Sequence, residues 1–201
     1  MEVPMSVLTL DEVRMLMEVP DRKPCYEIRQ VPPRTNTAIV YCNDPWFRDS
    51  HKQFFRRELH LGLERGAEDF LPCPVLGGGA IFVHPKVAAA QIQSLGDTLE
   101  TLRTSFGTIT ELPMIGHFGC KRMARIYQQM GLPLDSGTDY VRRDLVTLAR
   151  AFESRNQVSV CPIGQLFRDF SLLDVKVYYL RPGIRDGCNV LWFEKIEPDF
   201  E

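Results

Sequence analysis

The sequence lacks the features that would assign it to several common classes of protein. No apolar run approaches the roughly 18 residues needed to span a membrane, and residues 1–11 lack the basic stretch and apolar block of an export signal. The formal net charge is only −2 and the basic residues are scattered, so nucleic acid is not an expected partner. No internal repeat or low-complexity segment is present. We therefore expect a cytoplasmic protein that binds neither membranes nor nucleic acid.

The composition is that of an ordinary globular protein. Of the 201 residues, 44% are hydrophobic and 25% are charged, which is enough for one well-buried core. The 6 cysteines could pair in principle, but the chain is not small and shows no export signal, so reduced thiols are expected rather than disulfides.

Apolar runs alternate with helical periodicity along most of the chain. The expected strands are Thr37 to Tyr41, Phe70 to Leu76, Ile109 to Ile115, and a closing pair, Val175 to Leu180 and Val190 to Phe193. The expected helices are His51 to Leu63, Pro85 to Phe106, Lys121 to Met130, and Asp139 to Arg155. This alternation predicts an α/β fold with a mainly parallel central sheet flanked by helices.

The first 34 residues have a different pattern. Leu8 to Met17 has the spacing of a short amphipathic helix, and Pro20 ends it. The proline-rich stretch from Asp21 to Arg34 is then an extended arm. Because this segment has little of its own to pack on, we expect residues 1–34 to mediate a homodimer or a higher homo-oligomer. Residues 35–201 are expected to form a single α/β domain.

Chemically active side chains follow two of the expected strands. Cys42 and Asp44 come after the first, and His117 and Cys120 come after the strand that ends at Ile115. Open α/β sheets place their ligand sites at such strand ends. Two thiols and one imidazole are a zinc-type set with a fourth position left for water, whereas a structural zinc site normally has four protein ligands. The set therefore predicts a catalytic zinc site.

Simpler explanations exist for each of these residues alone. His117 and Cys120 could be core residues near the start of a helix. Asp44 could be the N-cap of a helix that begins at Pro45, and that role is compatible with a place at the metal site. Together with Cys42, the set favours metal binding over a core role.

A glycine turn and three further histidines are also candidates for a functional role. The turn Gly77-Gly78-Gly79 could cradle an anion before a helix, but it lacks the spacing of nucleotide-binding loops. The histidines His51, His60 and His84 are expected at the surface or at helix ends. Of these, His84 lies close enough to the glycine turn to be a candidate proton shuttle.

In order along the chain, Cys42-Asn43-Asp44, the glycine turn and His117-Phe118-Gly119-Cys120 resemble the β-class carbonic anhydrases. Their pattern is C-x-D-x-R, a Gly-containing turn, and H-x-x-C at the start of a helix. The resemblance runs from about Asn36 to about Phe193. It implies reversible hydration of CO2 to bicarbonate by a zinc-bound hydroxide. The implied zinc ligands are Cys42, His117 and Cys120, and Asp44 would orient the nucleophile or ligate the metal itself.

By the same resemblance, Gly77, Gly78 and Gly79 line a pocket for a small substrate through their backbone. The chain departs from the pattern there, because the family's Arg is Trp46 and the Gly after the second Cys is Lys121. In the family that Arg pairs with the Asp and holds it away from the metal.

Arg48, Lys121 and Arg122 are candidates to replace the missing Arg. If none does, Asp44 closes the zinc site and the protein is catalytically silent. A pocket remodelled by Trp46 and Lys121 would instead favour a zinc hydrolase or lyase that acts on another small substrate.

Overall fold

The computed structural model describes residues 36–61, 70–106, 109–134, 137–153 and 173–198. The chain divides into two units, residues 1–32 and 33–201, and all of the described residues belong to the second. The expected helix at Leu8 to Met17, the arm that follows it and the oligomer contact assigned to residues 1–34 lie outside the described residues.

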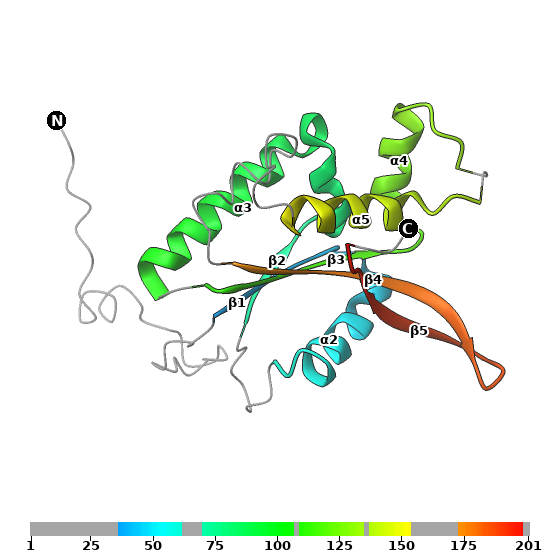
Figure 1. Cartoon of the computed structure of the whole chain (residues 1–201), viewed down its shortest axis with the longest axis horizontal. Helices are drawn as coiled ribbons and strands as arrows, with labels where there is room; N and C mark the ends of the chain where they lie inside the picture. The colour runs from blue at the N-terminus through cyan, green and yellow to red at the C-terminus, as the bar shows by residue number, and fades with distance from the viewer. Residues whose placement is uncertain (1–35, 62–69, 107–108, 135–136, 154–172, 199–201) are drawn as a thin grey trace, which may run out of the picture. The chain divides into compact units, whose positions relative to one another are not determined.

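A five-stranded sheet with the order β2-β1-β3-β4-β5 forms the centre of the second unit (Figure 1). The strands are β1 (Thr37–Tyr41), β2 (Phe70–Pro74), β3 (Glu111–His117), β4 (Asp174–Arg185) and β5 (Cys188–Lys195). All neighbours pair in parallel except β4 and β5, which are antiparallel. The predicted α/β fold with a mainly parallel sheet is confirmed.

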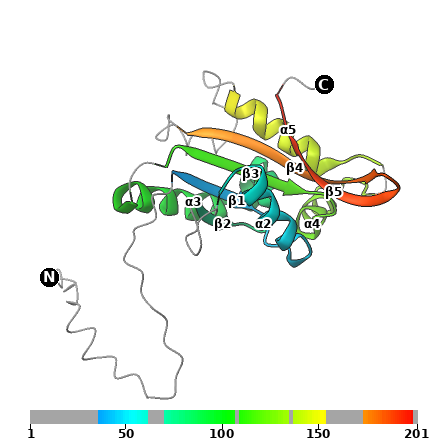
Figure 2. The same cartoon turned by 90° about the horizontal axis from the view of Figure 1, so that it is seen from below.

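Helices cover both faces of this sheet, as Figures 1 and 2 show. One face carries α2 (Arg48–Arg57), which follows the short 3₁₀ helix η1 (Pro45–Phe47). The other face carries η2 (Gly78–Val83), α3 (Pro85–Phe106), α4 (Lys121–Gln129) and α5 (Tyr140–Glu153). In the described part of the chain, no helix combines the length and apolar character that a membrane crossing requires.

Alternation along the strands divides the core into two clusters. Val40 and Met114 pack with the larger cluster, under α5 and η2. Ile39 and Ile115 pack with Phe54 and other aromatic residues on the α2 side. Because the side chains of a strand alternate between its faces, both sides of the parallel strands are apolar, as expected for a sheet buried on both faces.

The closing strand pair is longer than its apolar runs predict. Pro182 and Gly183 lie inside β4 and pair with β5, although their residue types are typical of a turn. The reversal occurs at Asp186 and Gly187, which have φ values of 52° and 75°. Two central residues with positive φ match the right-handed twist of a hairpin, so the chain turns there.

Candidate metal centre

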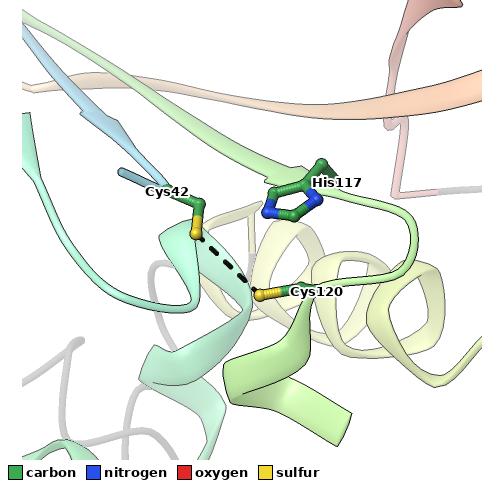
Figure 3. Close-up of side chains that lie close together, drawn as sticks. All are labelled: Cys42, His117 and Cys120. Carbon is green, nitrogen blue, oxygen red and sulfur yellow. Dashed lines mark hydrogen bonds between the residues drawn. The ribbon is translucent and has the colours of Figure 1, made fainter. Parts of the chain in front are cut away.

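Three ligand-type side chains meet at the end of the central strands. Cys42 directly follows β1, His117 is the last residue of β3, and Cys120 immediately precedes α4. Their ligand atoms all lie within 4.8 Å of one another, and the residues are only 4%, 1% and 3% exposed. Figure 3 shows the imidazole next to the two sulfur atoms, which are 3.9 Å apart. This buried cluster could bind a metal ion such as zinc.

The orientation of His117 fits a metal ligand. Its Nδ1 lies 2.8 Å from the carbonyl oxygen of Phe118, and because a carbonyl only accepts, Nδ1 carries the proton. Nε2 is therefore the unprotonated nitrogen of the neutral ring. It is buried and has no hydrogen-bond partner among the described residues. An unpaired buried polar atom costs about 1–3 kcal/mol, and a metal ion would satisfy this one.

The two thiols differ in how readily they lose a proton. The hydrogen-bond contact between the two sulfurs, together with burial, raises the pKa of Cys42. The same contact lowers the pKa of Cys120 to about 4 against the opposing effect of burial, and His117 and the Met123 backbone N–H add to the lowering. The surroundings of Cys120 thus favour its thiolate, which is the form that binds zinc.

Electrostatics around His117 agree with a thiolate at Cys120. Burial lowers the pKa of His117, but interaction with the Cys120 sulfur outweighs it, so that the net shift is upward. The Phe118 carbonyl and the Asp44 carboxylate add to the rise. The cluster therefore places a charged sulfur directly beside the His117 imidazole.

Asp44 lies at the edge of this centre, where it caps η1. Its Oδ1 accepts a hydrogen bond of 3.1 Å from the Trp46 backbone N–H, and Pro45 opens the helix, so the N-cap prediction is confirmed. Its carboxylate is not part of the group of ligand atoms around Cys42. Within the described ranges, no lysine or arginine lies within salt-bridge distance of Asp44.

The residues expected to shape the pocket occupy different environments. Trp46 is 83% exposed, and Arg48 and Lys121 are exposed as well. Arg122 is half-buried, and its Nε is buried without a partner in the described part of the chain. The replacement cation and the substrate-pocket roles therefore stay predictions.

The glycine turn packs closely against the ends of the two strands that carry the ligands. Gly77 and Gly78 have φ values of +103° and +57°, which favour glycine. A Cβ at Gly78 would lie 2.2 Å from the Ile115 carbonyl oxygen and 3.2 Å from the Cys42 nitrogen, so the turn touches both ligand strands. The Gly77 backbone N–H also hydrogen-bonds to the Cys42 sulfur and lowers its pKa. Gly79 packs in the same way, because its Cβ would lie 3.1 Å from Met114 Cβ.

Of the histidines expected at the surface or at helix ends, His51 is buried and His84 lies at a helix end. His51 is 1% exposed, so the prediction of a surface residue is wrong for it. It follows Phe47 by one helical turn and precedes Phe54 and Phe55, and this spacing places it on the apolar face of α2. His84 ends η2 as expected, but its Nε2 lies 2.6 Å from Asp144 Oδ2 in a nearly buried pair.

No protein-family model matches the sequence, and no curated protein matches it significantly. Among solved structures, the chain is similar to an apo form of carbon disulfide hydrolase, at 15% sequence identity and a TM-score of 0.34. The match covers 75% of this chain and 76% of that one. A likeness at this level assigns neither a family nor an activity.

Proposed function

We propose that this chain is a zinc enzyme of the β-carbonic-anhydrase type, which converts CO2 and water reversibly to bicarbonate and a proton. The observation that carries the proposal is the unpaired Nε2 of His117, which lies with the sulfurs of Cys42 and Cys120 in one buried cluster. Three protein ligands leave a fourth position of a tetrahedral site for a reactant, whereas structural zinc sites normally use four.

The chain's own groups prepare this cluster for a soft divalent cation. The Phe118 carbonyl fixes the ring tautomer of His117, and backbone N–H groups stabilise both sulfurs in their charged form. Zinc bound there would supply a Lewis acid that lowers the pKa of water, less strongly than at a site with three imidazoles because two thiolates neutralise its charge. A thiolate-rich set also favours zinc over magnesium or calcium.

Asp44 is the proposed orienting group for the attacking water. Its Oδ1 is held by the Trp46 N–H, and Oδ2 has no protein partner within the described segments. A carboxylate oxygen accepts a hydrogen bond from water, so Oδ2 would fix the direction of the water's lone pair toward carbon. The backbone cap thus takes over part of the restraint that an arginine would supply from position 46.

The proposal is tested by stopped-flow CO2 hydration with zinc-loaded protein, and Cys120→Ser serves as the control without an intact site. We expect proton release above the uncatalysed rate, and we expect it to disappear in the variant. Protein that binds about one zinc ion per chain but does not accelerate hydration at any pH would overturn the proposal. It would instead indicate a closed zinc site or another small substrate.

A further inference from the structure

Besides His117, a second histidine has buried ring nitrogens without a hydrogen-bond partner in the described part of the chain, namely His51 in α2. Its ring lies among aromatic side chains, with centroids 5.3 Å from Tyr41, 5.8 Å from Phe193 and 6.1 Å from Phe55. Both ring nitrogens are buried, and neither has a hydrogen-bond partner among the described residues. His51 is only 1% exposed, so bulk water does not replace the missing partners.

A purely structural role does not account for this residue. A neutral imidazole has one donor and one acceptor, and a buried polar atom without a partner lowers stability. Phenylalanine would fill aromatic surroundings of this kind without that cost. A histidine at this position therefore requires a hydrogen-bonding molecule that the described protein groups do not supply.

Residues close to His51 also adjoin the ligands of the metal centre. Phe47 precedes it by one helical turn, and the Phe47 ring lies 4.5 Å from the ring of His117. On the other side, Tyr41 is the residue before Cys42 in the chain. His51 thus contacts Tyr41, which precedes Cys42, and lies one helical turn from Phe47, whose ring contacts His117.

Electrostatics agree with this placement. Burial lowers the pKa of His51 to about 4, electrostatic interaction with His117 adds to the lowering, and Asp44 opposes it. Both residues therefore lie close enough for their charges to reach the ring. The ring is neutral at physiological pH and keeps both a donor and an acceptor.

We propose that His51 is a catalytic residue that binds the water consumed in the reaction, in a position beside His117 and Asp44. One ring nitrogen accepts a hydrogen bond from this water and the other donates to a second water molecule. The inference rests on the proposed function and deepens it, because it assigns a binding site to the second reactant. His51 takes no proton in this role; it delivers and orients a neutral water molecule.

The kinetic test compares His51→Phe with His51→Gln, which keeps a donor and an acceptor. For His51→Phe we expect unchanged zinc content, a thermal midpoint no lower than that of the wild type, and a kcat for CO2 hydration reduced by about tenfold to a hundredfold with an unchanged KM. His51→Gln should recover part of the lost rate. The exposed His60→Asn is the control and should match the wild type.

A second readout is independent of activity. In the zinc-loaded wild type, NMR should detect magnetisation transfer between the His51 ring N–H and a bound water molecule. Wild-type kcat in His51→Phe, or the absence of this water signal, would overturn the inference. A water signal in a protein that does not hydrate CO2 would instead reject the proposed function and retain the water site. If His51→Phe does not fold, His51→Gln and the NMR signal still decide the question.

Discussion

Two buried polar groups of this molecule differ in whether the protein satisfies them. In the first, Asp144 Oδ2 accepts hydrogen bonds from His84 Nε2 at 2.6 Å and from the Tyr127 hydroxyl at 2.7 Å. In the second, His117 and His51 hold buried ring nitrogens without partners in the described part of the chain. Buried polar groups are normally paired, so the first group needs nothing more, whereas the second indicates that a ligand is required.

The satisfied group has a structural explanation. Its three side chains come from the C-cap of η2, from α5 and from α4, and the rings of His84 and Tyr127 lie 5.9 Å apart. The network therefore ties the helix that begins next to Cys120 to the two elements beside it. The Nε2 of His84 is engaged with Asp144, and the proton-shuttle role considered for this histidine stays a prediction.

The largest expected effect comes from removal of a metal ligand. Cys42→Ser and Cys120→Ser should each weaken zinc binding by more than about 100-fold. That factor is the upper end of the loss seen when only an outer-shell partner of a metal ligand is mutated. Zinc content is measured after dialysis by elemental analysis. The control Cys188→Ser removes an exposed free thiol and should keep the metal. Full retention of zinc in both ligand variants would show that the unpaired group is not a metal site.

The next effect concerns the satisfied network. Asp144→Ala should lower the free energy of unfolding by about 3 kcal/mol or more, because it leaves His84 and Tyr127 buried without their acceptor. Tyr127→Phe removes one donor and should cost about 1 kcal/mol. Urea unfolding measures both, and the folded variants should still bind zinc. Unchanged stability together with lost zinc would reverse the roles assigned to the two groups.

Acid pH offers a third test. Burial lowers the pKa of His51 from 6.5 to about 4, so between these values the unfolded chain binds a proton that the folded chain does not. This contribution to stability is present above pH 6.5 and is lost as pH falls toward 4, at a cost of about 3 kcal/mol. His51→Phe should lose that part of the acid destabilisation. The measurement is the difference between the two unfolding free energies across this pH range, and a constant difference would contradict the assignment.

The smallest effect is expected at position 46. Trp46 is exposed, so an arginine there does not disturb the core, and it would give Asp44 a charged bidentate partner in addition to the backbone cap. Trp46→Arg should therefore raise CO2 hydration near neutral pH severalfold. Trp46→Lys supplies the charge without the bidentate geometry and should help less. Equal rates in all three proteins would mean that the cap alone positions Asp44.

The sequence predicts the site better than its surroundings, for a physical reason. Cys42 and His117 follow local apolar runs, and parallel strands place their carboxyl ends at one edge of the sheet. Local patterns are therefore sufficient to bring the ligands together. The burial of His51 depends on Phe193 in β5, and the pairing of His84 depends on Asp144 in α5. Such contacts between distant segments leave no local signal.

Local patterns also give too short a hairpin. Pro182 and Gly183 are residue types typical of turns, but β5 pairs with them across the antiparallel ladder. The side chain of Trp192 lies against Gly183, where a Cβ would be 3.1 Å from its Nε1. Tertiary packing therefore decides the strand length at this position, as it often does for strands.

The most direct test of the central claim is zinc X-ray absorption spectroscopy on protein purified without chelators. The account predicts about one zinc ion per chain, with two sulfur neighbours near 2.3 Å and two lighter neighbours near 2.0–2.1 Å. His117 would supply one of the lighter neighbours, and a solvent molecule would supply the other. Protein without zinc, or zinc with fewer than two sulfur neighbours, would contradict the assignment of Cys42, His117 and Cys120 as a metal centre.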